Sequence, residues 1–157
     1  MRIGIGYDVH RLAEGERFVL GGVEIRHEKG MIGHSDADVL LHAIADALLG
    51  AAALGDLGTH FPDTEVEWAG ADSQDLLRRV MQRLREEGYT AQNVDATVLL
   101  ERPKLRPHVD TMRANIATVL GLGRPRISVK ATTTEGLGFV GREEGVAAKA
   151  VCTIRSA

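Results

Sequence analysis

The sequence predicts an α+β fold, a two-layer sandwich in which helices cover one face of a mixed four-stranded β-sheet and a β-hairpin lies at the sheet edge. Two observations predict it. Segments with the apolar pattern of strands lie at the start, middle and end of the chain, and amphipathic helical segments lie between them. The 157 residues, 44% of them hydrophobic, also suffice for one core without disulfides. We therefore expect a single domain over residues 1–157, with the second face of the sheet free to meet another subunit.

The N-terminal part supplies the first strand and the hairpin. Residues 2–9 have the pattern of a strand. Residues 17–20 and 23–26 are two short apolar segments on either side of Gly21 and Gly22, a pattern typical of a tight β-hairpin.

The first predicted helix follows the hairpin. Ser35 suits the N-cap position, and Asp36 and Asp38 suit the positive end of the helix dipole. Residues 39–49 are strongly compatible with a helix, which we expect to end within residues 50–55.

A polar, turn-rich segment over residues 56–71 is typical of a binding loop or of a solvated connector. Asp72 and Ser73 then cap a second helix, which Gly88 ends. The apolar residues of this helix fall on one face, and its arginines read as a solvated face because acidic residues lie among them.

The C-terminal half continues the alternation. Residues 94–101 read as a strand, and Pro107 opens a third helix that ends at Gly121. Residues 127–131 and 146–154 are the last two predicted strands.

Asp8, His10 and His42 form a candidate metal site. Residues two apart in a strand share one face, so Asp8 and His10 project together. His42 points from the second turn of the first helix. A single histidine is more often an ordinary core or surface residue, but two imidazoles and a carboxylate give the three ligands with which a catalytic zinc keeps its fourth position open.

The sequence does not decide which residue accepts a hydrogen bond from the second ring nitrogen of His42. Metal-binding imidazoles usually donate their other N–H to a carboxylate or a carbonyl. Asp46 lies four residues after His42 and Asp38 four residues before it, and both share its helix face. Either carboxylate is a candidate.

A second candidate site lies at the end of the strand at 127–131. Residues 132–134 are three threonines, and Glu135 follows them. Their hydroxyls and backbone amides can hold phosphate oxygens, while Glu135 can hold a divalent cation that bridges those oxygens.

Composition excludes several classes of function. A net charge of −3 and a pI near 6.1 leave no extended basic face for nucleic acid. The single Cys152 permits no internal disulfide and reads as a small buried hydrophobe. We find no signal peptide and no membrane-length apolar segment, so we expect a cytoplasmic protein without a membrane partner.

Together these motifs closely resemble the family of 2-C-methyl-D-erythritol 2,4-cyclodiphosphate synthases, and the match covers almost the whole chain. The matching motifs are Gly4-Ile5-Gly6-Tyr7-Asp8-Val9-His10, His34-Ser35-Asp36-Ala37-Asp38, Lys130-Ala131-Thr132-Thr133-Thr134-Glu135, and residues 21–23, 42–43, 46–47, 55–58, 61–64, 93–95, 103–104 and 138–142.

The resemblance implies a homotrimer whose sheets face the three-fold axis and whose active sites lie at subunit boundaries. It also implies a phosphorus-oxygen lyase of the non-mevalonate isoprenoid pathway. Such an enzyme closes the small-molecule substrate 4-diphosphocytidyl-2-C-methyl-D-erythritol 2-phosphate into the cyclic diphosphate and releases CMP. The chain length indicates the form without an added cytidylyltransferase domain.

The resemblance further implies roles for individual residues. Zn²⁺ is held by Asp8, His10 and His42, and Mg²⁺ or Mn²⁺ by Glu135. His34 and Thr133 act as catalytic residues on the phosphates, and Ser35 binds the substrate by contacting a phosphate. The methylerythritol part is bound by Asp56, Leu57, Gly58, Phe61, Pro62, Asp63, Thr64 and Glu65. The cytidine pocket is formed by Leu100, Glu101, Arg102, Pro103, Lys104, Leu105, Arg106, Ala131 and Thr132, and the adjoining wall or central channel by Phe139 and Arg142.

The sequence departs from the family pattern chiefly at Glu101, Arg102 and Arg106, where backbone groups can read cytosine equally well. Two alternatives stay open. A zinc-dependent phosphodiesterase or phosphatase uses a metal-bound water in place of the internal phosphate. A non-catalytic trimer binds diphosphates or isoprenoids near Phe139 and Arg142 without turnover.

Overall fold

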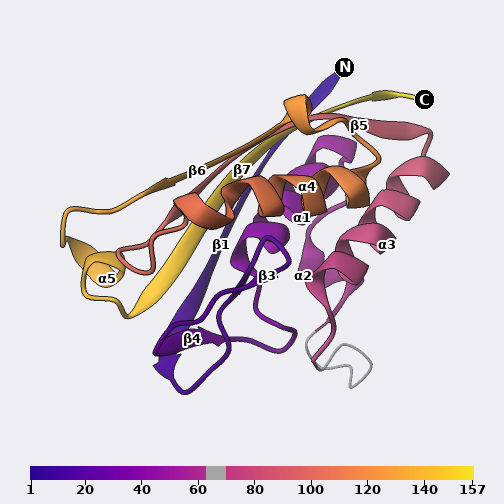
Figure 1. Ribbon diagram of the computed structural model, residues 1–157. Helices are drawn as coiled ribbons and strands as arrows, with labels where there is room; N and C mark the ends of the chain where they lie inside the picture. The colour runs from indigo at the N-terminus through magenta and orange to yellow at the C-terminus, as the bar shows by residue number, and fades with distance from the viewer. Residues whose placement is uncertain (63–69) are drawn as a thin grey trace.

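The computed structural model describes residues 1–62 and 70–157, which form a β-sheet covered on one face by helices (Figure 1). The sheet has five strands in the order β4-β1-β7-β5-β6. Its strands are β1 (Arg2–Glu14), β4 (Lys29–Ile32), β5 (Tyr89–Leu99), β6 (Ile127–Thr132) and β7 (Gly145–Ser156). Strands β5 and β6 run parallel, whereas the other neighbours are antiparallel, so the predicted mixed sheet is confirmed.

Three longer helices cover the sheet, and shorter helical turns lie in the connections. The covering helices are α1 (Val39–Ala52), α3 (Ser73–Glu86) and α4 (Val109–Leu120). The short ones are α2 (Leu57–His60), η2 (Arg106–His108), η3 (Arg124–Arg126) and α5 (Gly138–Gly141). Helix α2 falls in the segment over residues 56–71, which the sequence indicates as a binding loop or a connector.

The prediction of four strands is wrong, because the edge strand β4 makes a fifth. β1 runs on to Glu14 instead of ending near residue 9, and its second half pairs with β4 from Arg11 opposite Ile32 to Glu14 opposite Lys29. The four residues of β4 include Gly30, which makes the strand signal weak. A Cβ atom on Gly30 would lie 2.2 Å from the carbonyl oxygen of Arg17, so this glycine allows the chain to approach closely.

The predicted hairpin exists, but it does not lie at the edge of the main sheet. Its strands β2 (Val19–Leu20) and β3 (Val23–Glu24) form a separate two-stranded sheet. Gly21 and Gly22 have φ values of 58° and 69°, the pair of positive angles that a tight two-residue hairpin turn requires.

Helix α1 begins differently from the prediction, because Asp38 and not Ser35 is its N-cap. Asp38 Oδ1 accepts hydrogen bonds from the backbone N–H groups of Leu41 and Gly21, and Oδ2 accepts one from Gly22. Burial raises the pKa of Asp38 to about 6, although these backbone donors oppose the shift. Asp38 therefore fastens the hairpin turn to the start of α1.

The core lies between the sheet and the helices and is aliphatic. Among the described residues, one cluster joins the buried residues of the sheet, the hairpin and all three long helices. Cys152 is buried in it, and burial raises the pKa of its thiol to about 12.

No helix in the described part of the chain is long and apolar enough to cross a membrane.

The opposite face of the sheet exposes a row of apolar side chains. Ile3, Ile5 and Tyr7 alternate along β1 with 70%, 72% and 52% of their surface exposed, and Val151 of β7 is exposed beside them. Because β-strand side chains alternate between faces, these residues point away from the helices. A contiguous apolar face of this kind is typical of a surface that another protein chain covers.

Candidate metal centre and substrate site

The even-numbered residues of β1 face helix α1, and two of them are glycines. A Cβ atom on Gly4 would lie 2.0 Å from the carbonyl oxygen of Ala47, and one on Gly6 would lie 1.9 Å from that of Ala43. The helix backbone therefore rests directly on the strand. This close packing brings His42 of α1 to the next two even positions of β1, Asp8 and His10.

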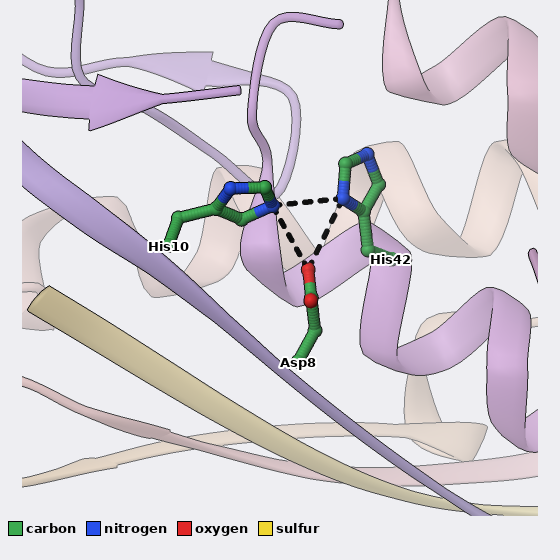
Figure 2. Close-up of side chains that lie close together, drawn as sticks. All are labelled: Asp8, His10 and His42. Carbon is green, nitrogen blue, oxygen red and sulfur yellow. Dashed lines mark hydrogen bonds and ion pairs between the residues drawn. The ribbon is translucent and has the colours of Figure 1, made fainter. Parts of the chain in front are cut away.

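Figure 2 shows the three side chains converging on one point. His10 Nε2 lies 3.0 Å from Asp8 Oδ2, and His42 Nδ1 lies 3.1 Å from the same oxygen. The two ring nitrogens lie 3.1 Å apart. The predicted cluster of Asp8, His10 and His42 is thus brought together, from a strand and a helix far apart in the sequence.

The donor set fits a small divalent cation. Ligand atoms about 2.0–2.1 Å from a tetrahedral zinc ion lie roughly 3.3 Å from one another, close to the distances in this triangle. A carboxylate oxygen and two imidazole nitrogens are also among the ligand types that zinc takes in proteins. Asp8, His10 and His42 therefore form a site that can hold a divalent metal.

The charges of this cluster depend on one another. Burial alone would raise the pKa of Asp8, but hydrogen bonds and charge attraction from His10 and His42 outweigh it and hold the pKa well below its usual range. Burial likewise opposes the charged form of His10, yet the hydrogen bond to Asp8 raises its pKa above the ordinary value. The site thus favours a negative oxygen facing a positive charge.

The ring nitrogens of His10 and His42 that point away from Asp8 have hydrogen-bond partners of their own, and those of His42 are not the two predicted carboxylates. His10 Nδ1 lies 3.0 Å from the carbonyl oxygen of Ile32 in β4. His42 Nε2 lies 2.9 Å from Ser73 Oγ and 3.1 Å from Ser35 Oγ. Neither carboxylate candidate takes this position.

The carboxylates of Asp46 and Asp38 accept hydrogen bonds from backbone N–H groups instead. Asp46 Oδ1 accepts a hydrogen bond of 2.7 Å from the N–H of Leu57, which ties α2 to α1. Asp38 caps α1 and holds the hairpin turn. The expectation that one of them partners His42 is therefore wrong, because nearby backbone N–H groups occupy both.

The residues predicted to bind the methylerythritol part lie partly beyond α1. Asp56 is the N-cap of α2, and its carboxylate accepts hydrogen bonds from the backbone and side chain of Thr59 at 2.8 and 2.7 Å. These bonds hold the pKa of Asp56 below its usual range. Phe61 and Pro62 follow α2, while Asp63, Thr64 and Glu65 lie outside the described residues.

The predicted cytidine residues gather around a separate cavity of about 230 Å³. Its lining consists of Leu100, Glu101, Pro103, Lys104, Leu105, Arg106, Ala131, Thr132 and Thr133. Of the predicted residues 100–106, only Arg102 is not in the lining. Its guanidinium group forms ion pairs with Glu143 at 2.8 Å and Glu28 at 3.0 Å.

Thr133 and Glu135 lie together in the turn after β6. The backbone N–H of Glu135 donates to Thr133 Oγ1 at 3.3 Å, and Glu135 has a φ of 55°. Glu101 braces this turn, because its Oε1 accepts hydrogen bonds from the backbone N–H and the hydroxyl of Thr134 at 2.9 and 3.2 Å. Thr133, which lines this cavity, and Glu135 in the same turn are both exposed.

Phe139 and Arg142, which were predicted to form one wall, make different contacts. Phe139 lines another cavity, of about 390 Å³, together with Tyr7 and Leu137. The guanidinium group of Arg142 pairs with Glu144 at 2.9 Å.

The strand register sets the distance between the cluster of Asp8, His10 and His42 and the cavity of about 230 Å³. Asp8 of β1 lies opposite Ala148 of β7. Ala148 lies opposite Val98 of β5, which pairs with Ala131 of β6. Three strand spacings of about 4.8 Å place the backbones of Asp8 and Ala131 roughly 14 Å apart. Both sites lie at the same end of the sheet, but on different strands of it.

Comparison with known proteins identifies the family. The sequence model of the YgbB family matches residues 1–155. The chain belongs to the YgbB family.

Two relatives of this YgbB family member carry the same name. The 2-C-methyl-D-erythritol 2,4-cyclodiphosphate synthase of Salinibacter ruber is 72% identical over 157 residues, which cover 100% of both chains. The synthase of Symbiobacterium thermophilum is 63% identical over 154 residues, which cover 98% of each chain. The resemblance that the sequence motifs indicate is thereby confirmed.

Solved structures agree with the fold. The bifunctional IspDF from Campylobacter jejuni matches with a TM-score of 0.95 and 43% identity over 99% of this chain, which spans 42% of that protein. A 2C-methyl-D-erythritol-2,4-cyclodiphosphate synthase in a form with CDP bound matches with a TM-score of 0.90 and 38% identity, over 98% of this chain and 100% of that one.

Sequence reasoning missed two features of this YgbB family member's site. Gly4 and Gly6 share the strand face of Asp8 and His10, and that parity was a usable signal for a helix packed closely on β1. Ser73 was read only as a helix cap, and no local pattern indicates its contact with His42, 31 residues away.

Proposed function

We propose that this YgbB family member converts 4-diphosphocytidyl-2-C-methyl-D-erythritol 2-phosphate into 2-C-methyl-D-erythritol 2,4-cyclodiphosphate and CMP, as a phosphorus-oxygen lyase of the non-mevalonate isoprenoid pathway. One observation supports it above the others: the donor atoms of Asp8, His10 and His42 converge within 3.1 Å in a chain whose named relatives are such synthases. We infer a cytoplasmic enzyme that acts on this small molecule.

Asp8, His10 and His42 are the residues that hold Zn²⁺. When bound there, Zn²⁺ would supply a positive charge that polarises a phosphoryl oxygen of the substrate. Glu135, exposed in the turn after β6, is the residue that holds Mg²⁺ or Mn²⁺.

The reaction itself needs little covalent chemistry from the protein. An oxygen of the substrate's 2-phosphate forms a bond to the β-phosphorus, and the bond between that phosphorus and the oxygen leading to the α-phosphate breaks. The electron pair leaves with CMP. Because the attacking phosphate is already anionic, the chain contributes mainly by positioning two phosphates and offsetting their repulsion.

Hydrogen-bond donors at the two ends of the site suit that task. Ser35 lies beside His42, 3.1 Å from its Nε2, and His34 precedes it in the chain. Thr133 lies at the rim of the cavity that holds the predicted cytidine residues. In the proposed enzyme, His34 and Thr133 donate to phosphate oxygens as negative charge moves from the 2-phosphate to the leaving CMP.

The distances within one chain favour active sites shared between subunits. A substrate that contacts both the zinc ligands and Glu135 must span strands β1 and β6, whose backbones lie roughly 14 Å apart at this level of the sheet. The exposed apolar row of Ile3, Ile5 and Tyr7 gives a surface through which chains can associate. We therefore place the cytidine cavity of one subunit beside the metal cluster of its neighbour, in a homotrimer whose sheets face the axis.

The cavity of about 230 Å³ is the proposed cytidine pocket. Its size and partly apolar lining suit a base and a ribose, and the solved relative with CDP bound supports a nucleotide ligand. Lys104 brings the pocket a positive charge. Asp56, Leu57 and Gly58 with the segment from Phe61 to Glu65 are proposed to bind and cover the methylerythritol part.

Product analysis tests the proposal. Purified protein with Zn²⁺ and Mg²⁺ is incubated with the substrate, and ³¹P NMR follows the phosphates. We expect equal amounts of CMP and a cyclic diphosphate. A linear hydrolysis product indicates the zinc-dependent phosphodiesterase instead, and tight binding without turnover indicates a non-catalytic binding trimer.

A further inference from the structure

The outer side of the His42 ring is held by hydrogen bonds to a residue of another helix. His42 Nε2 lies 2.9 Å from Ser73 Oγ, at the first residue of α3. Ser73 Oγ donates in turn to Asp36 Oδ1, and the Ser73 backbone N–H donates to Asp36 Oδ2 at 3.1 Å. Ser73 is only 1% exposed, which keeps water from competing strongly for these bonds.

Hydrogen-bonding capacity fixes where the protons lie in this chain of residues. A carboxylate can only accept hydrogen bonds, so the Ser73 hydroxyl donates its hydrogen bond to Asp36. The Ser73 oxygen then has lone pairs left for the N–H at His42 Nε2. With the His42 proton at Nε2, the lone pair of Nδ1 points toward Asp8 Oδ2 and His10 Nε2, each 3.1 Å away.

We propose that Ser73, backed by Asp36, is a positioning residue that holds the His42 ring in the rotation and tautomer that metal binding requires. The inference rests on the proposed function, since it takes Asp8, His10 and His42 as the metal ligands. It gives His42 the same kind of outer partner that the Ile32 carbonyl gives His10.

Ser35 does not serve equally well, although its Oγ lies 3.1 Å from the same nitrogen. Its oxygen already accepts a hydrogen bond of 3.2 Å from the backbone N–H of Ala37, and its side chain is only half-buried. Ser73 is buried and is held by a carboxylate from the other side. Ser35 is therefore free to turn to a phosphate while Ser73 keeps the ring in place.

Asp36 is itself held firmly enough to act as the support. Its Oδ1 accepts a hydrogen bond of 3.2 Å from the N–H of Asp38, and its own N–H donates to the carbonyl oxygen of Ala71 at 3.0 Å. These bonds join the segment before α1 to the segment before α3. The start of α3 thus takes part in the geometry of a metal ligand that lies on α1.

The test uses the full-length protein, stripped of metal with a chelator. Zinc affinity is measured by competition with a chromophoric chelator, and the visible absorption spectrum of the cobalt-substituted protein reports the ligand geometry. We expect Ser73→Ala to weaken zinc binding about 10- to 100-fold and to change the cobalt spectrum, the usual effect of losing such an outer partner. Asp36→Asn should weaken zinc binding in the same direction.

Two variants separate positioning from structural support. Asp72→Ala removes the N-cap of the same helix, whose side chain accepts from the N–H of Gln74 at 2.8 Å, so it should lower the unfolding midpoint while zinc affinity stays within about twofold. Ser35→Ala removes the other hydroxyl near His42. It should keep zinc affinity within about threefold while it slows CMP release.

The outcomes are distinct. Unchanged zinc affinity and an unchanged cobalt spectrum in Ser73→Ala overturn the inference, as does an equal loss of affinity in Asp72→Ala. If wild-type protein binds one zinc ion per chain but releases no CMP, the proposed function fails and the role of Ser73 is still measured by the affinities.

Discussion

The carbonyl oxygen of Ala43 in α1 lies 1.9 Å from the position that a Cβ atom on Gly6 of β1 would take. Strand and helix backbones therefore touch where any other residue would hold them apart. His42 precedes Ala43 in the helix, and Asp8 is the next residue of the strand that faces it. The arrangement of Asp8 and His42 in the candidate metal site consequently depends on a glycine that contributes no donor atom.

Replacing this glycine should disturb both the fold and the metal site. We expect Gly6→Ala to lower the free energy of unfolding by about 1–3 kcal/mol, the usual cost of overpacking, and to weaken zinc binding because α1 must move outward. Urea unfolding and chelator competition measure the two effects.

Gly50→Ala is the matched control. Gly50 lies in α1, and the nearest atom to its added Cβ is 4.0 Å away, so the variant should gain up to about 1 kcal/mol of stability from helix propensity. If Gly6→Ala proves as stable as this control and binds zinc equally well, the close packing of α1 on β1 has no role in the site.

Removing a metal ligand should abolish activity without unfolding the protein. His42→Ala deletes the Nδ1 donor of the triangle, so we expect loss of stoichiometric zinc and a fall in CMP release greater than the roughly 10²–10³ that one lost preorganised donor costs. Circular dichroism should stay unchanged. His108→Ala, at the start of α4, should retain both metal and activity; a metal-free His42→Ala that still turns over refutes the assignment.

Zinc binding should weaken in acid, beginning at a pH above the ordinary histidine value. The pKa of His10 is raised by Asp8, and a protonated imidazole cannot bind the ion. As the pH falls below that raised pKa, the apparent zinc affinity should drop by about tenfold per unit for each proton that competes. Isothermal titration between pH 8 and 5 measures the slope, and a flat profile contradicts histidine ligands.

The metal-free protein should respond to pH in the opposite sense. A raised histidine pKa adds stability that is fully present below about 6.5 and is lost as the pH rises through the folded-state value. The lowered pKa of Asp8 adds stability that is present above about 3.9 and is lost as the pH falls through its folded-state value. The Asp8–His10 pair should therefore stabilise the metal-free fold most between about pH 4 and 6.5. The test compares the free energy of unfolding of metal-free wild type and Asp8→Asn as a function of pH.

A charge on the exposed sheet face should separate the subunits but spare the metal cluster. Ile5 is 72% exposed in the single chain, so Ile5→Asp should leave its fold intact while making association unfavourable. We expect sedimentation to show monomers that keep one zinc ion per chain, since all three ligands come from one chain, yet release no CMP.

Gln82→Asp on the exposed side of α3 supplies a charge of the same sign away from that face, and its oligomeric state should match wild type. If wild-type protein itself sediments as a monomer with full activity, sites shared between subunits are excluded.

The family and the shared strand face of Asp8 and His10 could be predicted from the sequence. Asp8 and His10 share a strand face whatever the rest of the fold does, and the match of motifs along the whole chain indicated the family that the comparisons confirm. Strand β4 could not be found in the same way, because only its pairing with the second half of β1 makes Lys29–Ile32 a strand. The Asp38 cap depends in the same way on the hairpin turn folding back over it.

The amino-acid sequence by itself determined which groups are available: two imidazoles and a carboxylate for a metal, glycines on the strand face beside them, and a threonine turn for phosphates. Only the tertiary structure decided which groups meet. The outer partner of His42 is Ser73, and neither Asp46 nor Asp38 takes that place. Arg102 pairs with Glu143 outside the cavity. Both are contacts between segments that lie far apart in the sequence. Local spacing does not encode such contacts, because the packing of α1 and α3 against the sheet sets them.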